Sequence, residues 1–431
     1  MVSSRSNRVL TISPTAILRD CYPKRVNRED FARLLTLEAQ QLLASVGDLD
    51  AKSDVVKLVS KLRSDGHDAG LVASVLSQAK LRRRARAKFG EFADSMLFTE
   101  AGLEQASRLS VSALHAGRFR AAGIKSVADL GCGIGSESLA LASLDLEVHA
   151  FEIDEVTAAA ATYNLAPFAN ASVELADVTK LDLSGFEALF FDPARRELQG
   201  AARARAIRKF DPAEFSPNFD WVVQQAQNRP TGIKLGPGHP HEGIPEASGA
   251  PIEAQWVSVA GDLVELGLWF GAVAREGVAR SALLIDSAGR HHEFNSASAA
   301  KTSAPLGELG RYLYEPDNAI VRSHLIGPLA ESLGLRGFAP EIAYLTSDEP
   351  VESAWLKSYR VLDEMPFDRK KLKAYLRERG IGILEIKKRG ADIVPENLRK
   401  ELQLKGESAA TLVVTRVGDA HRAIIAESRK P

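Results

Sequence analysis

The chain has 431 residues, of which 45% are apolar and 26% are charged, a balance typical of a globular protein with about two to four domains. It contains no run of about 18 apolar residues, which excludes a membrane-spanning helix, and we expect no secretory signal because no apolar run follows Met1. The two cysteines, Cys21 and Cys132, lie far apart in the sequence, so disulfide bonds cannot be the scaffold and a cytoplasmic protein is expected.

The net charge of −1 conceals an asymmetry along the chain. Residues 1–90 carry 17 Lys and Arg against 9 Asp and Glu, residues 91–355 carry 20 against 36, and residues 356–431 carry 18 against 11, so the balances are +8, −16 and +7. Two basic ends around an acidic middle fit an enzyme that binds a polyanion. Solvated helix faces would give the same pattern, so charge alone leaves both interpretations open.

The N-terminal part is predicted to be helical. Residues 1–28 are irregular and are expected to form a flexible tail, whereas residues 29–120 contain no proline and are rich in Ala, Leu and Gln. Apolar residues between Phe31 and Leu43 recur at spacings near 3.6, which indicates an amphipathic helix, and more helices are predicted over 51–64 and 69–95. These patterns predict an all-helical N-terminal domain over residues 29–120.

Short apolar runs alternate with helical stretches from Ile124 onward, and this predicts an α/β core over residues 121–334 with parallel strands joined by helices. The strands predicted from these runs are Ser126–Leu130, Val148–Phe151, Ser172–Leu175, Ala188–Phe191 and Thr231–Leu235. The helices predicted between them are Ser136–Ser143 and Val156–Leu165. Gln255–Val259 and Val264–Phe270 flank a glycine turn, which favours a hairpin, and Ala282–Ile285 is predicted as one more antiparallel strand.

Residues 335–431 are predicted to form a third region, a small α+β domain with a basic surface. Its predicted strands are Glu341–Leu345, Leu384–Lys387, Thr411–Arg416 and Arg422–Ala426, of which the last two are expected to pair. Its predicted helices are Asp368–Arg379 and Pro395–Leu402, and the second has proline near its first turn.

The most specific pattern is the segment Val127–Gly135, in which an apolar strand runs into three alternating glycines and a helix follows. Glycine suits such a loop because a side chain would block the close approach of the backbone to a ligand. A loop for a nicotinamide dinucleotide reads G-x-G-x-x-G, whereas this one reads G-x-G-x-G. Asp129 precedes the glycines, and its negative charge disfavours a pyrophosphate but suits a ligand with an ammonium group.

The D-x-G-x-G-x-G pattern of Asp129, Gly131, Gly133 and Gly135 resembles the first motif of class I S-adenosylmethionine-dependent methyltransferases. The resemblance implies a Rossmann-like fold for the core. It also implies S-adenosyl-L-methionine as the cofactor, bound in part by these four residues. The alternative is an α/β domain with a chance glycine-rich turn.

Further acids follow in the order in which this family uses them. Glu152 ends the second predicted strand, where an acid can accept hydrogen bonds from both ribose hydroxyls. Asp177 follows the third strand, and the resemblance implies that it binds the adenine amino group while the next backbone N–H, that of Val178, contacts the adenine ring. The ordered series is more specific than any one of its motifs and favours the methyltransferase.

Asp192 and Pro193 follow the fourth predicted strand, where open α/β sheets place their ligands, and they are the predicted catalytic residues. Many class I enzymes that methylate the amino groups of bases carry acid-Pro-Pro-aromatic here, where the acid or a carbonyl accepts the amino protons and the aromatic ring stacks on the base. This chain departs from that pattern with Ala194 and Arg195. Arg195 is predicted to stack on a base or contact a phosphate. The alternative for Asp192 is a helix-capping or turn residue.

Other candidates lie outside these motifs. Thr99 is predicted to cap a helix that in related enzymes closes over the methionine end of the cofactor, so Thr99 is expected to contact the cofactor and Phe98 the substrate. Lys234 ends the fifth strand and is expected to meet a substrate phosphate, or else to be an ordinary strand-end lysine. His239 and His241 form an H-P-H sequence, but no third ligand is visible and no metal site is predicted.

A basic run lies on one predicted helix, and its charges cannot share a single face because neighbours are about 100° apart. Its members are Arg82, Arg83, Arg84, Arg86 and Lys88. The run is expected either to contact phosphates or to reach acids elsewhere in the chain.

The C-terminal stretch from Leu384 to Arg416 resembles the THUMP-like domain of a bacterial group of class I methyltransferases, and the helical block and the segment Tyr312–Asp317 fit the same group. THUMP domains proper bind RNA in tRNA-modifying enzymes, so RNA is the suspected partner. The sequence therefore predicts a methyltransferase that acts on a nitrogen of a base in structured RNA, either tRNA or rRNA. The alternatives are a small-molecule or protein methyltransferase of the same fold, and a catalytically silent RNA-binding relative.

Overall fold

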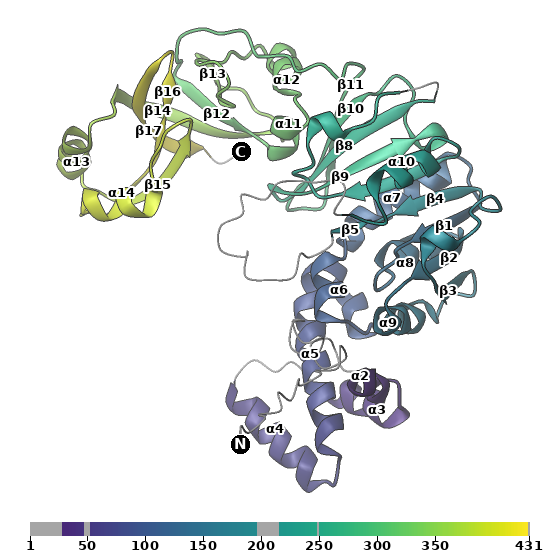
Figure 1. The fold of residues 1–431 in the computed structure, drawn as a ribbon. Coiled ribbons are helices and arrows are strands. Elements are labelled where there is room, and N and C mark those ends of the chain that lie inside the picture. Colours follow the sequence, from purple (N-terminus) through teal and green to yellow (C-terminus); the bar gives the residue numbers. More distant parts are fainter. Residues whose placement is uncertain (1–27, 47–51, 196–214, 248–249, 430–431) are drawn as a thin grey trace, which may run out of the picture. The chain divides into compact units, whose positions relative to one another are not determined.

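The computed structural model describes residues 28–46, 52–195, 215–247 and 250–429 (Figure 1). The chain forms two compact units, residues 1–231 and 232–431. Within the described ranges, no helix combines the length and the apolar character needed to cross a membrane. Of the predicted flexible tail, only Arg28 belongs to the described residues.

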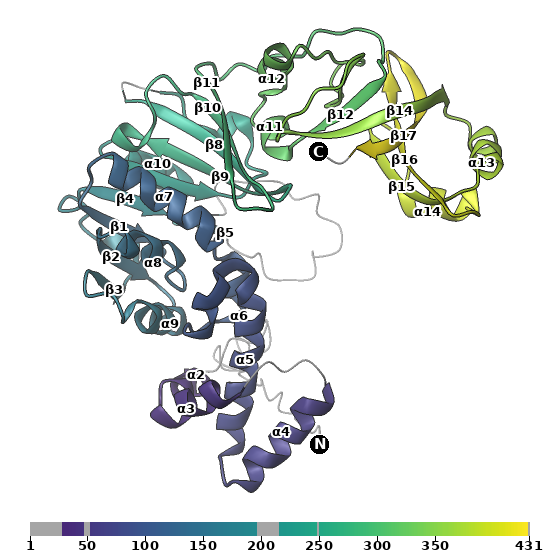
Figure 2. The same cartoon turned by 180° about the vertical axis from the view of Figure 1, so that it is seen from behind.

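The first unit begins with helices, as predicted. They are α2 (Arg28–Leu34), α3 (Leu37–Ser45), α4 (Lys52–Ser64), α5 (Ala69–Phe89), the 3-10 helix η1 (Gly90–Asp94), α6 (Glu100–Gln105) and α7 (Leu109–Ala121). The single helix expected from Phe31 to Leu43 is broken in two, because the Thr36 hydroxyl caps α3 by accepting a hydrogen bond from the Ala39 N–H at 3.3 Å. Helices α2 and α3 both pack against the long helix α5, and the view from behind shows the same arrangement (Figure 2).

The sheet of the first unit contains four parallel strands in the order β4-β1-β2-β3. Strands and helices alternate as β1 (Ser126–Leu130), α8 (Ser136–Ser143), β2 (Glu147–Glu152), α9 (Glu155–Leu165), β3 (Ala171–Leu175), the 3-10 helix η2 (Val178–Lys180) and β4 (Ala188–Phe191). Each predicted strand is therefore confirmed to within one residue at either end. Because the strands are parallel, the C-terminal ends of β1, β2, β3 and β4 lie at one edge of the sheet. The predicted residues Gly131, Glu152, Asp177 and Asp192 lie at or just after these ends.

The first unit ends with short elements that the sequence did not predict. They are β5 (Ala194–Arg195), β6 (Phe215–Ser216) and α10 (Phe219–Ala226). Strands β5 and β6 form a two-stranded antiparallel ribbon directly after Asp192 and Pro193.

The second unit carries β7 (Thr231–Leu235), β8 (Ile252–Val259), β9 (Asp262–Phe270), β10 (Arg280–Ile285) and β11 (His291–Ser296), in the order β7-β9-β8-β10-β11. The predicted hairpin is confirmed: β8 and β9 are antiparallel, and Ala260 and Gly261 make the turn with φ of +51° and +89°. The antiparallel prediction for Ala282–Ile285 is wrong in one respect. Strand β10 is antiparallel to β11 but parallel to β8, because β9 ends beside the start of β8 and β10 begins at that same end.

A six-stranded sheet follows in the same unit, with the order β13-β12-β14-β17-β16-β15. Its strands are β12 (Tyr312–Pro316), β13 (Leu345–Ser347), β14 (Leu356–Pro366), β15 (Ile381–Arg389), β16 (Ser408–Val417) and β17 (Ala420–Arg429), and its helices are α11 (Asn318–Arg322), α12 (Ile326–Leu333), α13 (Arg369–Glu378) and α14 (Pro395–Leu402).

Two details of this sheet correct the sequence analysis. Strand β12 pairs with β14, so the sheet begins before the boundary expected at residue 335. The strand expected over Glu341–Leu345 is wrong except at Leu345, because Glu341 has a left-handed φ of +59° that interrupts an extended chain. The pairing expected between the last two strands is confirmed.

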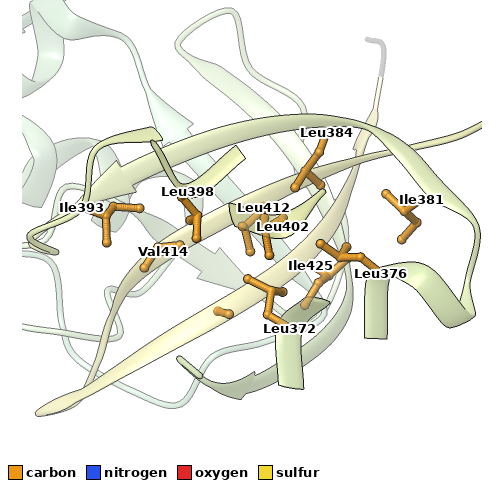
Figure 3. Packing of buried hydrophobic residues seen from close by; sticks show 11 residues of the cluster. Leu372, Leu376, Ile381, Leu384, Ile393, Leu398, Leu402, Leu412, Val414 and Ile425 are labelled. Carbon is orange, nitrogen blue, oxygen red and sulfur yellow. The ribbon is translucent and has the colours of Figure 1, made fainter. Parts of the chain in front are cut away.

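Helices α13 and α14 pack on this sheet through a cluster of leucine, isoleucine, valine and alanine side chains (Figure 3). Leu372 and Leu376 come from α13, Leu398 comes from α14, and Leu412 comes from β16, which lies between β17 and β15. Leu372 and Leu412 are fully buried. Burial of these side chains, rather than helix propensity, therefore fixes two short and highly charged helices on the sheet.

Replacing Leu412 by alanine is expected to lower the free energy of unfolding by about 2–5 kcal/mol, because the truncation leaves a cavity between the helices and the sheet. Urea denaturation followed by circular dichroism measures the change. Leu362 of β14, which is 44% exposed, supplies the matched control, and Leu362→Ala should stay within about 1 kcal/mol of the wild type. Equal losses in the two variants would contradict this assignment of the core.

Candidate active site

The glycine loop between β1 and α8 is held by backbone hydrogen bonds to the neighbouring strand. The N–H groups of Gly131 and Cys132 donate to the Phe151 carbonyl at 2.9 and 3.0 Å. Gly131, Gly133 and Gly135 have φ of +90°, +57° and +85°. Side chains rarely adopt this left-handed region, so the loop needs glycine at all three positions for its conformation. A Cβ on Gly133 would meet nothing within 4 Å, so open space borders the loop there.

Asp129, the acid before the glycines, lies inside the protein. Its side chain is fully buried, and one carboxylate oxygen accepts a hydrogen bond from the Ser138 hydroxyl in α8. The expected contact of this carboxylate with the ammonium group of the cofactor stays a prediction. In the structure, Asp129 ties the end of β1 to α8 and thereby positions the glycine loop between them.

Glu152 joins the end of β2 to the glycine loop. Its carboxylate accepts hydrogen bonds from the N–H groups of Gly133 at 3.0 Å and of Ile153 and Asp154 at 2.9 Å each. Burial raises the pKa of this carboxyl group, and the three backbone donors partly offset the effect. Ile153 beside it is 66% exposed, and the sequence analysis had not singled out this apolar residue.

Asp177 caps the short helix η2, as an acid at that place can. Its carboxylate accepts from the Thr179 hydroxyl at 2.7 Å and the Thr179 N–H at 3.1 Å, and it pairs with Lys180 at 3.1 Å. These partners, the Thr179 hydroxyl first, lower its pKa, so it is ionised at neutral pH. Val178 is buried, and the Ala176 N–H donates to the Glu152 carbonyl at 2.9 Å, which keeps the ends of β2 and β3 together.

Asp192 lies next to the glycine loop, at the end of β4. A Cβ built on Gly131 would come within 3.5 Å of the Asp192 carbonyl oxygen, so the two backbones are neighbours. Strands β1 and β4 are paired up to Leu130 and Phe191, which places the next residues of each chain side by side. Asp192 is half-buried and Pro193 is buried. The backbone of Ala194 and Arg195 then pairs with β6, and nothing is described of the Arg195 side chain.

Helix α6 packs directly on the glycine loop, and its expected position near the cofactor stays a prediction. A Cβ on Gly102 would lie 2.4 Å from Ile134 Cγ2, so only glycine permits this contact. The Thr99 hydroxyl caps the helix by accepting from the Gly102 N–H at 3.0 Å, as predicted. Phe98 is 1% exposed and packs on Phe89 with ring centroids 5.5 Å apart. Phe98 is therefore packed in the core, and its expected contact with the substrate stays a prediction.

The basic residues of α5 contact groups of the segment around α6 and do not form one solvent-exposed surface. Arg84 and Arg86 pair with Glu100 and Asp94, and Arg82 donates to the Met96 carbonyl at 2.8 Å. Lys88 donates to the carbonyls of residues 103, 104 and 106, where α6 ends. Cations suit the C-terminal end of a helix, and these contacts favour the interpretation that the run reaches groups of its own chain.

Asn164, which the sequence analysis missed, fastens the segment before α6 to the glycine loop. It is buried in α9, accepts from the Leu97 N–H at 2.7 Å, and donates to the carbonyls of Leu97 at 3.0 Å and Ile134 at 2.9 Å. Its partners are 67 and 30 residues away in the sequence, so no local pattern could have identified it.

The N164A variant is expected to lose about 2–4 kcal/mol of folding free energy and also to bind the cofactor more weakly, because one buried N–H and two carbonyls lose their partner beside the loop. Asn170 is a matched control, since its amide donates to the carbonyls of Ala142 and Leu146 in the same unit. Asn170→Ala should reduce stability only. Thermal denaturation and calorimetric titration separate the effects, and equal cofactor affinity in both variants would contradict the role of Asn164.

The remaining candidates belong to the second unit. Lys234 is half-buried in β7, and His239 is fully buried in the loop after it. Across the described residues, no group of three or more His, Cys, Asp or Glu side chains is arranged to hold a metal ion.

The geometry fits S-adenosyl-L-methionine. Three left-handed glycines leave open space beside the loop, an acid hydrogen-bonded to that loop ends β2, and an ionised acid follows β3. Cys132 in the loop is buried, and burial raises the pKa of its thiol well above the usual value, so it is not a reactive thiolate.

Several known proteins are similar to this chain. The family model "THUMP domain-like" matches residues 356–428, and a "Domain of unknown function (DUF8688)" matches residues 27–85. An uncharacterized S-adenosylmethionine-dependent methyltransferase of Mycobacterium tuberculosis CDC 1551 is 31% identical over 344 residues, which are 78% of this chain and 91% of that protein. Its counterpart in strain H37Rv matches equally well.

The fold also occurs in a solved structure. A candidate methyltransferase from Porphyromonas gingivalis W83 superimposes with a TM-score of 0.67 at 20% identity, over 89% of this chain and 100% of that one. The chain belongs to the S-adenosylmethionine-dependent methyltransferases, in the class I group with a C-terminal THUMP-like domain. It is an enzyme that uses S-adenosyl-L-methionine, and its class I core carries a helical N-terminal region and a small α+β domain.

Proposed function

We propose that this enzyme methylates a nitrogen of a base in structured RNA, either tRNA or rRNA. The observation that carries the proposal is the position of Asp192 and Pro193, whose backbone lies against Gly131 of the glycine loop. A carboxylate and a carbonyl at this edge of the sheet offer acceptors for an amino group held next to the cofactor.

The residues of the first unit supply position rather than strong acid or base chemistry. When bound, S-adenosyl-L-methionine supplies a methyl group attached to a positively charged sulfur. Asp192 accepts hydrogen bonds from the amino group and thereby directs the lone pair of the nitrogen toward the methyl group. A nitrogen attached to an aromatic ring loses its proton readily after it has attacked the methyl group. Correct placement of the two reactants contributes up to about 7–11 kcal/mol to such a reaction.

The cofactor is assigned to the residues around the glycine loop. The carboxylate of Glu152 accepts hydrogen bonds from the ribose hydroxyls. Asp177 and the Val178 N–H recognise adenine, and the exposed Ile153 side chain covers one face of this base. Thr99 and Gly133 border the amino-acid end of the cofactor.

The C-terminal domain supports RNA as the substrate class. Its THUMP-like match spans residues 356–428, and residues 356–431 carry 18 basic against 11 acidic side chains. On α13, Lys370, Lys371 and Arg377 are exposed. Such a surface fits a phosphate backbone. Arg195 and Lys234 remain predicted contacts to the substrate.

The test is incubation of the full chain with methyl-labelled cofactor and separate RNA, protein and metabolite fractions from cells. We expect the label in the RNA fraction. Label in the protein or metabolite fraction would replace RNA by that substrate class, and cofactor binding without any transfer would indicate a relative that has lost catalysis.

A further inference from the structure

A stack of aromatic rings in the second unit has no role in the chemistry described above. His241, which begins the short 3-10 helix η5 (His241–Gly243), stacks on His324 with ring centroids 3.7 Å and planes 11° apart. It also stacks on Trp256 of β8, with centroids 5.0 Å and planes 22° apart. His324 is half-exposed, so the stack reaches the surface of the unit at that ring.

Basic groups surround this stack. The guanidinium of Arg280 lies 5.5 Å from the centroid of the Trp256 ring. Arg322 donates to the carbonyls of Pro237 at 3.2 Å and His239 at 2.8 Å, and so holds the loop that carries His241. The positive charge of Lys301 lowers the pKa of His324, and the negative charge of the exposed residue Glu242 raises it.

One polar atom of the cluster lacks a partner. Among the described residues, the buried Nε of Arg280 has no hydrogen-bond acceptor, although the residue as a whole is half-buried. Burial and the neighbouring charges lower the pKa of His241 to about 4, so its ring is neutral at pH 7 and the positive charge resides on the arginines. A desolvated N–H of a cation without an acceptor is costly, and an anion bound beside it removes the cost.

The backbone conformation of His324 is set by the end of α11. Its φ is +64°, in the left-handed region, and the N–H groups of His324 and Leu325 donate to the carbonyls of Val321 at 3.4 Å and Ile320 at 3.1 Å. These two hydrogen bonds cap the C-terminus of the helix, and the cap fixes the position from which the ring of His324 stacks on His241.

We propose that this cluster binds a single-stranded segment of the substrate RNA, with a base stacked on His324 and a phosphodiester group held by Arg280. Aromatic platforms next to cations are the usual means by which proteins hold unpaired nucleotides. The inference rests on the proposed RNA substrate, and it gives the H-P-H sequence a role in nucleotide binding instead of metal binding.

The test is a fluorescence anisotropy titration of the full chain with a fluorescein-labelled single-stranded RNA of about 12 nucleotides, at a series of salt concentrations. Arg280→Gln should weaken binding about tenfold and reduce the slope of log K against log salt by about 0.7, the value for one phosphate contact to a single strand. His324→Ala should weaken binding about tenfold without changing the slope. Arg290→Gln is the control, because Arg290 is exposed and paired with Asp286 on the same unit.

If thermal denaturation shows that Arg280→Gln or His324→Ala is unstable, conservative variants at the same positions test the inference. Arg280→Lys should retain the salt slope, and His324→Phe should bind as tightly as the wild type. Wild-type affinity in both Arg280→Gln and His324→Ala, or no binding of the oligonucleotide by the wild type at low salt, would overturn the inference. Failure of the proposed function has a different signature, since cellular RNA would then receive no methyl label whatever the affinity of the variants.

Discussion

The D192A variant is expected to bind S-adenosyl-L-methionine as the wild type does and to turn over about 100- to 1,000-fold more slowly. Asp192 follows β4 beside the glycine loop, and its carboxylate is assigned to the acceptor nitrogen rather than to the cofactor. Removing one group that stabilises and positions the reacting atoms typically costs a factor of this size. The measurement is single-turnover methylation of total RNA with labelled cofactor, together with calorimetric titration of the cofactor.

Asp182 offers a matched control for this prediction. It is an acid of the same unit whose carboxylate accepts from the Ser184 N–H at 2.9 Å, and it belongs to a turn rather than to a strand end. Asp182→Ala should leave turnover within about twofold of the wild type. If Asp192→Ala methylates at the wild-type rate, Asp192 has no part in the mechanism. If it loses cofactor affinity instead, Asp192 belongs to the cofactor site.

The second large effect is expected at Glu152. Glu152→Ala should weaken cofactor binding by about 100-fold or more, because the variant loses the proposed acceptor of the ribose hydroxyls and the bond that holds the Gly133 N–H. A change of 100-fold corresponds to about 2.7 kcal/mol of binding free energy. Burial raises the pKa of the Glu152 carboxyl and so disfavours its ionised form. Hydrogen bonds donated by the ribose hydroxyls would favour the ionised form and oppose this effect.

Calorimetric titration with S-adenosylmethionine and its demethylated product measures this effect. Glu155→Ala is the control, since Glu155 is an exposed acid at the start of α9 that pairs with Arg28. Glu155→Ala should bind both ligands as the wild type does. A dissociation constant for Glu152→Ala within about threefold of the wild type would remove Glu152 from the cofactor site.

The sequence predicted β1 and β4 with their observed bounds because each is a short, mainly apolar and buried segment that is followed by a glycine or a polar residue. An exposed strand with few apolar side chains carries a weaker local signal. β11 alternates between exposed and half-buried residues and contains few apolar side chains, so the pairing with β10 defines it.

The motifs of the candidate site were visible in the sequence, but the contacts of their side chains were not. Asp129 accepts a hydrogen bond from Ser138, and the contacts of Asn164 join segments that lie far apart in the chain. The packing of Phe98 on Phe89 was likewise not visible in the sequence. Spacing identifies which residues follow which strands, whereas tertiary packing decides which side chains face a ligand.

The most direct measurement is nucleoside analysis of RNA methylated by the purified enzyme. RNA from cells lacking the enzyme is incubated with methyl-labelled cofactor, digested to nucleosides and separated, and each labelled nucleoside is identified by mass spectrometry. We expect the label on a base nitrogen and, with Asp192→Ala, labelling that is about 100-fold slower or more. Label on a ribose oxygen or a ring carbon, or no labelled nucleoside at all, would contradict the proposed function.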